Sequence, residues 1–116
     1  GRLNQARSVG VELKHLAVNG GSLSANSKKA CDNTAGDDQS YGIWSYDTFS
    51  SDGINASITI SRGSVLATSG DIAVSANSLS LADGITAQVS TDMNGTDQTK
   101  YTDGANLEKY KWFSAH

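Results

Sequence analysis

Aspartates and aromatic side chains gather in one part of the sequence, between residues 28 and 53. Aromatic rings stack on the apolar faces of sugar rings, and carboxylates accept hydrogen bonds from sugar hydroxyls. These residue types within one segment predict a glycan-binding site. The predicted ligand-binding residues are Trp44, Tyr46, Phe49, Asp37, Asp38 and Asp47.

A structural interpretation of the same segment stays open beside the functional one. In it, Tyr41 or Trp44 points inward and covers a core of small side chains, as buried aromatic residues often do where they anchor loops. The aspartates are then solvated turn residues, for which Asp is well suited.

Calcium is the metal that these aspartates suggest, because it takes clustered oxygen ligands. One candidate set consists of Asp37 and Asp38 with Asp32 or Asp47. A second candidate is the segment 92–97 followed by Asp103, although Asp97 stands where a calcium loop has glycine. We expect no cofactor, with calcium as the alternative.

The sequence carries no catalytic signature. Glycoside hydrolysis needs a matched pair of carboxylates, and the spacing of the aspartates selects no pair. A Ser-His-Asp triad would have to use His15, and no Gly-x-Ser-x-Gly motif is present. Cys31 is the only cysteine, which excludes an intrachain disulfide and a cysteine-based zinc site. We therefore expect a protein that is not an enzyme.

Composition narrows the remaining classes. The net charge of −3, without a dense Lys or Arg cluster, argues against nucleic-acid binding. No apolar run is long enough for a membrane span. The chain begins at Gly1, and we expect it to be a trimmed portion of a longer precursor with neighbouring domains. An apolar share of 37%, without proline, favours thin layers of short β-strands over a thick core.

An internal repeat predicts how such strands are arranged. Residues 16–27 align with residues 58–69 at an offset of 42, with Leu16 on Ile58 and Gly21 on Gly63. Leu79 and Leu81 align with Ile58 and Ile60 at an offset of 21, and the later apolar positions of this third copy slip by about one residue. The underlying period is therefore near 21 residues.

The first repeat is longer because two loops are inserted into it. If Ile43 is aligned with Ile72, the 21 additional residues divide into 13 before this strand and 8 after it. We place the two loops at residues 28–40 and 45–53. Loops on a rigid scaffold concentrate binding residues, so this enlarged repeat is the predicted place of function.

A period near 20 with several short strands and Gly or Asp at the corners predicts an all-β fold, a short right-handed parallel β-helix (solenoid). The alternative is a β-sandwich with hairpins at Asn19-Gly20 and Asp83-Gly84, because both dipeptides favour type I′ turns. We expect residues 1–90 to form the solenoid. Residues 91–116 are expected to form a polar loop and an aromatic C-terminal cap, in which Tyr110, Trp112 or Phe113 covers the last repeat.

The segments Gly20–Ala25, Tyr41-Gly42-Ile43-Trp44 and Ile58–Thr68 together resemble the β-helix repeats of secreted surface proteins of gut Firmicutes. Those repeats join an apolar-Thr-apolar strand, a Gly-Gly turn and a Tyr-Gly-Ile strand. Arg62 replaces the first glycine of one turn, and the third copy lacks the Tyr-Gly-Ile element. The resemblance implies a secreted or cell-surface location and a role in adhesion or carbohydrate binding. A purely structural stalk or spacer and a carbohydrate-active enzyme are the alternative functions.

Overall fold

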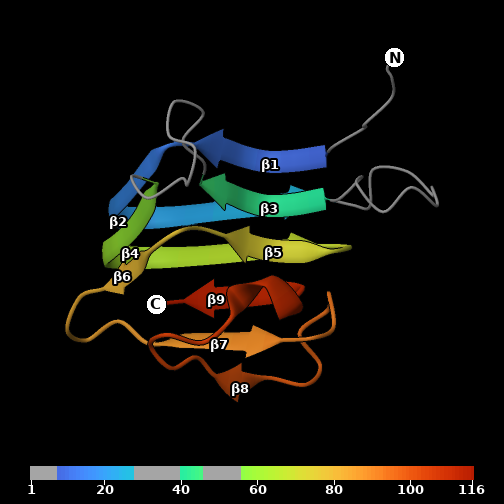
Figure 1. The fold of residues 1–116 in the computed structure, drawn as a ribbon. Helices are drawn as coiled ribbons and strands as arrows, with labels where there is room; N and C mark the ends of the chain where they lie inside the picture. The colour runs from blue at the N-terminus through green and yellow to red at the C-terminus, as the bar shows by residue number, and fades with distance from the viewer. Residues whose placement is uncertain (1–7, 28–39, 46–55) are drawn as a thin grey trace, which may run out of the picture.

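The computed structural model describes residues 8–27, 40–45 and 56–116, which form two β-sheets and one short 3-10 helix (Figure 1). The described part of the chain is therefore all-β, as predicted. The strands are β1 (Ser8–Leu13), β2 (His15–Ser27), β3 (Ser40–Ser45), β4 (Ser57–Ser69), β5 (Ile72–Ser75), β6 (Leu79–Leu81), β7 (Ala87–Ser90), β8 (Thr99–Lys100) and β9 (Trp112–Ala115), and the helix is η1 (Leu107–Lys109).

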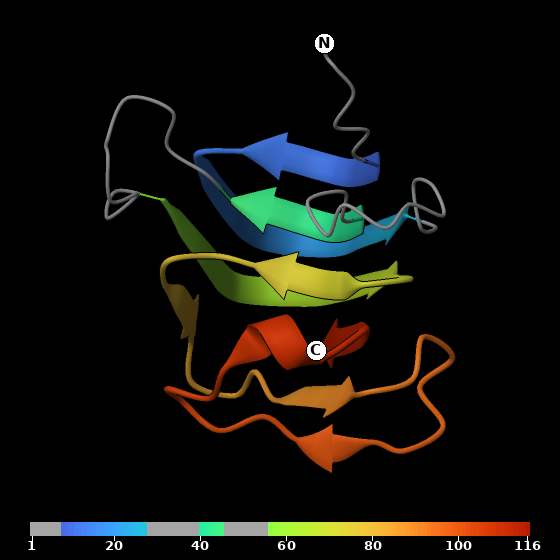
Figure 2. The ribbon, with the colours of Figure 1, turned by 45° about the vertical axis from the view of Figure 1, so that its right-hand side comes forward.

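From β1 to β6 the chain passes alternately between the two sheets. The first sheet has the order β1-β3-β5, with parallel pairing throughout. The second sheet has the order β2-β4-β9-β7-β8, and β6 pairs with β4 off this path. Figures 1 and 2 show β1, β3 and β5 as one layer, with β2 and β4 behind them. From β1 to β6, consecutive strands thus lie in different layers, whereas β7, β8 and β9 stay in the second sheet.

The hydrogen-bond register confirms both offsets of the repeat. Leu16 pairs with Ile58 and Leu23 with Val65, in parallel strands at an offset of 42. Ile58 pairs in turn with Leu79, at an offset of 21. The alignment predicted the register because equivalent inward side chains stack when the same pattern recurs in each strand.

The position of β3 corrects the predicted loops. Ile43 pairs with Val74 and not with Ile72, so the additional residues divide into 11 and 10 instead of 13 and 8. Ser40 and Ser45, predicted as loop residues, begin and end β3 and are buried. The reason is packing, because Ile43 and Val74 both belong to the hydrophobic core and must face inward together.

The third repeat is split by the C-terminal strand. On the side of β4 away from β2, β6 pairs only with Ile58–Ile60, so the second half of β4 has no parallel neighbour on that side. β9 lies along this half in antiparallel orientation, with Ala67 opposite Phe113, and Phe113 is in turn opposite Val89 of β7. β7 therefore runs parallel to β4 at an offset of 22, one strand further away. The one-residue slip seen in the sequence accompanies this insertion.

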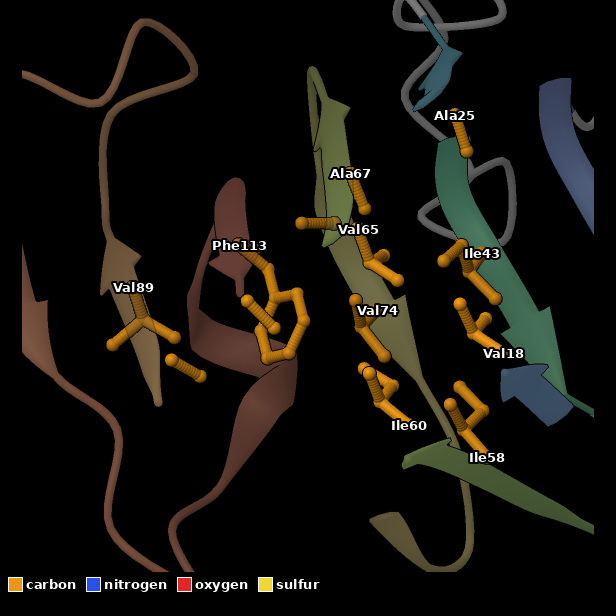
Figure 3. Close-up of a cluster of buried hydrophobic side chains, with 13 residues drawn as sticks. Val18, Ala25, Ile43, Ile58, Ile60, Val65, Ala67, Val74, Val89 and Phe113 are labelled. Carbon is orange, nitrogen blue, oxygen red and sulfur yellow. The ribbon is translucent and has the colours of Figure 1, made fainter. Parts of the chain in front are cut away.

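The hydrophobic core lies between the two layers. Figure 3 shows Phe113 between Val89 and the aliphatic side chains of β4 and β5, and Ile43 beside Val18. Gly42 in β3 has no room for a side chain, because a Cβ there would lie 2.6 Å from the Ala73 carbonyl oxygen of the neighbouring β5 and 3.0 Å from the Thr68 carbonyl oxygen of β4 in the other layer. Only glycine fits there.

Buried serines hold the corner between β4 and β5. The Ser69 hydroxyl donates to the Ser40 carbonyl oxygen at 2.7 Å and accepts from the Asp71 amide at 3.0 Å. The Asp71 carboxylate accepts from the Ser40 amide at 2.8 Å. The same contact recurs 21 residues later, where the Asp92 amide donates to the Ser90 hydroxyl at 3.0 Å. These contacts satisfy backbone groups where the chain leaves one sheet.

The two dipeptides of the β-sandwich alternative do not join antiparallel strands. Asn19 and Gly20 lie within β2, which pairs in parallel with β4. Among the described strands, β6 and β7 flank Asp83-Gly84 without pairing to each other. In the part of the chain that the structure describes, antiparallel pairing is confined to β9 and its neighbours and to the β7–β8 pair. The pairing pattern alone does not establish a right-handed parallel β-helix, which stays a prediction. In the described ranges, no helix has the length and apolar character needed to cross a membrane.

Candidate functional site

Of the predicted ligand-binding residues, the structure places Trp44. The others, Tyr46, Phe49, Asp37, Asp38 and Asp47, lie outside the described residues. Trp44 is half-buried and, unlike the preceding Ile43, does not belong to the core cluster, so its ring lies on the outer side of the first sheet. The Tyr41 ring stacks on it, with centroids 4.9 Å apart and planes 10° from parallel. Neither ring belongs to the core cluster, although Tyr41 is buried.

A groove that the sequence analysis did not predict lies between the segments that follow β5 and β8. It consists of two adjoining hollows of about 380 and 360 Å³, which share Leu79, Tyr101 and Asp103 as walls. This size is typical of small-molecule sites. One wall is the segment 76–81, which leads from β5 into β6, and the other is the segment 101–108, which leads from β8 into η1. The polar lining residues are Asn77, Ser78, Ser80, Tyr101, Asp103, Asn106 and Glu108.

Backbone hydrogen bonds fix the second wall. The Tyr101 amide donates to the Ala87 carbonyl oxygen at 2.9 Å, which ties the segment to β7. A turn follows, closed by the Ala105 amide on the Thr102 carbonyl oxygen at 3.0 Å, and Gly104 has the positive φ of 88° that this turn requires. Asn106 caps η1, because its side-chain oxygen accepts from the Glu108 amide at 3.1 Å.

Tyr101 is the aromatic side chain of the groove. Its ring meets Phe113 edge to face, with centroids 6.4 Å apart, so a core residue supports it from behind. Leu79, Leu81 and Leu107 are half-buried against the same core and give the groove an apolar floor. Burial, and then the charge of Asp103, raise the pKa of the Tyr101 hydroxyl, which therefore stays protonated and able to donate at neutral pH.

The groove is acidic. Asp103 and Glu108 both line it, and no Lys, Arg or His is among the lining residues. The Glu108 carboxylate also accepts a hydrogen bond of 3.3 Å from the Ser75 hydroxyl. Such a groove offers acceptors to hydroxyl and amino groups and repels anions.

Within the described ranges, no group of three His, Cys, Asp or Glu side chains is placed to hold a metal ion. In the second calcium candidate, the Asp92 carboxylate accepts from the Thr96 hydroxyl at 2.9 Å and from the Asn94 amide at 3.1 Å. These bonds form a local turn. The first calcium candidate, Asp32, Asp37, Asp38 and Asp47, lies outside the described residues.

His15 and Ser57 form an exposed pair away from the groove. The two residues are opposite each other in β2 and β4, and the Ser57 hydroxyl lies 2.8 Å from Nδ1 of His15. Neither residue lines a described hollow. The contact is a cross-strand pair of the kind that stabilises sheets.

The groove has a weak signal in the sequence, because its two walls are irregular segments with no repeat between them. The isolated Tyr101, followed by the turn residues Asp103 and Gly104, was the one available indication. Comparison of the chain with protein-family models, with curated proteins and with solved structures gives no match.

Proposed function

We propose that the chain is a non-enzymatic carbohydrate-binding module, and that the groove around Tyr101 holds the sugar. The observation that carries this proposal is a supported aromatic ring in a groove of about 380 Å³ whose other lining groups are amides, hydroxyls and carboxylates. A sugar has an apolar ring face and many hydroxyls, so it matches both parts of this lining. The absence of a cation among the lining residues favours neutral or amino sugars over uronic acids.

The scaffold that we propose is a short right-handed parallel β-helix, closed at one end by the antiparallel strands. The parallel registers of 42 and 21 residues and the alternation of the chain between two sheets support it. The resemblance to surface proteins of gut Firmicutes supports a secreted or cell-surface location.

A glycan screen tests the proposed function. Neutral, amino and uronic-acid oligosaccharides are presented to the full chain, and we expect binding to neutral or amino sugars. Tyr101→Ala abolishes this binding, whereas Tyr101→Phe retains the ring and most of the affinity. Asn77→Ala removes an exposed amide from the opposite wall, so we expect it to weaken binding without loss of folding. Tyr110→Ala is the matched control, because Tyr110 is a neighbouring aromatic residue outside the lining of the groove.

The same screen addresses catalysis. Asp103 and Glu108 are two carboxylates in one groove, which a glycosidase would also need. Both come from the segment 101–108 and therefore belong to one wall. We expect no reducing sugar to be released on prolonged incubation with any glycan that binds. Binding to no glycan would overturn the proposed function.

A structural spacer is the second candidate function, and the exposed end of the layers favours it. Leu16 and Leu23 of β2 are half-buried, whereas their partners Ile58 and Val65 in β4 are each 1% exposed. Within the described ranges, β2 has a strand neighbour on one side only. A further repeat stacked there would complete the burial. A chain that binds no glycan but gains stability when one more 21-residue repeat precedes it would support this role.

A further inference from the structure

We propose that the ligand site continues from the groove across the outer face of the first sheet to Trp44, so that it takes an oligosaccharide and not a single sugar. This inference rests on the proposed function. It joins the aromatic residue singled out in the sequence to the groove found in the structure.

A continuous row of side chains connects the two places. Trp44 in β3 pairs with Ser75 in β5. The Ser75 hydroxyl donates to the Glu108 carboxylate at 3.3 Å, and Glu108 lines the groove. Neighbouring strands lie about 4.8 Å apart, so Trp44 is one strand spacing from Ser75. Figure 2 shows β3, β5 and η1 following one another down the front layer.

The chemistry of this row suits a sugar chain. Trp44 is half-buried, and Tyr41 stacks on its ring and restricts its orientation. A ring that is already held in one orientation loses little conformational entropy when a ligand binds to it. The hydroxyl of Ser75 and the carboxylate of Glu108 provide hydrogen-bonding groups between the Trp44 ring at one end and Tyr101 at the other.

The dependence of affinity on chain length follows from this arrangement. A disaccharide fills the groove and does not reach Trp44, whereas a hexasaccharide contacts both aromatic residues. Because one additional aromatic contact contributes roughly 3- to 10-fold in affinity, the hexasaccharide binds more tightly by about that factor.

The experiment is calorimetric titration of the full chain with cello-, chito- and manno-oligosaccharides of two and six units. We expect Trp44→Ala to lower the affinity for the hexasaccharide by roughly 3- to 10-fold, to the level of the disaccharide. Affinity for the disaccharide stays within about twofold. Trp44→Phe retains an aromatic face and restores part of the difference. Circular dichroism and thermal melting establish that each variant is folded.

A second readout needs no variant. The indole Nε1–H signal of Trp44 in the unmodified chain is expected to shift with the hexasaccharide and not with the disaccharide. If binding depends on Tyr101 but not on chain length or Trp44, the inference is wrong and the proposed function stands. If none of the oligosaccharides binds, the proposed function fails and the inference fails with it.

Discussion

Replacing Phe113 by alanine tests whether β9 is an integral part of the fold. Phe113 is 1% exposed and lies in the second sheet between Ala67 of β4 and Val89 of β7. It also supports the ring of Tyr101 at the groove. The substitution therefore removes core packing and the support of the Tyr101 ring together.

The expected loss of stability can be derived from these contacts. Truncation of a buried Phe to Ala costs about 3–5 kcal/mol, and the cost is highest where neighbours cannot close the cavity. Ala67 and Ala115, next to Phe113 on β4 and β9, are too small to fill the space. The lost edge-to-face contact with Tyr101, about 0.5–1.5 kcal/mol, is part of this cost. We therefore expect about 4 kcal/mol, a large part of the roughly 5–15 kcal/mol typical of a domain.

Urea denaturation monitored by circular dichroism measures this loss, and the midpoint is expected to fall by about 2 M. Leu66→Ala is the control, because Leu66 neighbours Ala67 in β4 and is 38% exposed, which predicts a change of about 0.5 kcal/mol or less. Phe113→Leu should recover at least half of the loss. A loss below about 1.5 kcal/mol for Phe113→Ala would refute the proposed packing of β9.

Two further predictions concern the corners of the chain. Ser69→Ala leaves the Asp71 amide and the Ser40 carbonyl oxygen without this partner in a buried corner, so we expect a loss of about 1–3 kcal/mol by urea denaturation. The exposed Ser24→Ala should leave stability unchanged, and equal effects of the two would contradict the role of the corner. The hydrogen bond from the Thr96 hydroxyl is the main cause that lowers the pKa of Asp92 in the folded chain. Because of this lowered pKa, the Asp92 carboxylate stabilises the fold at a pH above its unfolded pKa of about 3.9, and this stabilisation is lost as the pH falls through the folded pKa. The urea midpoint of Asp92→Asn should therefore decline less on acidification than that of the unmodified chain. Parallel declines of the two midpoints would contradict this assignment.

The repeat could be predicted from the sequence because each strand carries its own copy of the inward pattern. Leu16, Ile58 and Leu79 stack in register, and their spacing in the sequence equals their spacing in the sheet. Parallel stacking of repeats is a nearest-neighbour arrangement, so local similarity contains the information that specifies it.

The insertion of β9 could not be predicted in the same way. Its pairing with β4 joins Phe113 to Ala67, segments with no shared pattern, and a non-local antiparallel contact of this kind has no periodic signal. The slip of one residue after Gly84 was visible, but the strand from the end of the chain that accompanies it was not. The alignment of Ile43 with Ile72 failed for a related reason, because a four-residue apolar segment fits several registers and only core packing selects one.

The sequence analysis placed the candidate site in the segment with the most aspartates and aromatic residues. Of the ligand-binding residues predicted there, the structure describes Trp44. The groove instead arises where residues 76–81 and 101–108 face each other. Each polar residue of the groove is, taken alone, a common turn residue, and nothing in the sequence indicates that they meet around Tyr101. Only the folded chain brings them together into one binding surface.

The most direct test of the central claim is a map of the bound sugar on the chain. Backbone amide signals are followed by nuclear magnetic resonance while cellohexaose or chitohexaose is added, whichever binds more tightly in calorimetry. We predict that the shifted signals gather in residues 76–81 and 101–108, together with the indole signal of Trp44. Binding that leaves the signals of residues 76–81 and 101–108 unmoved would contradict the assignment of the groove as the carbohydrate site.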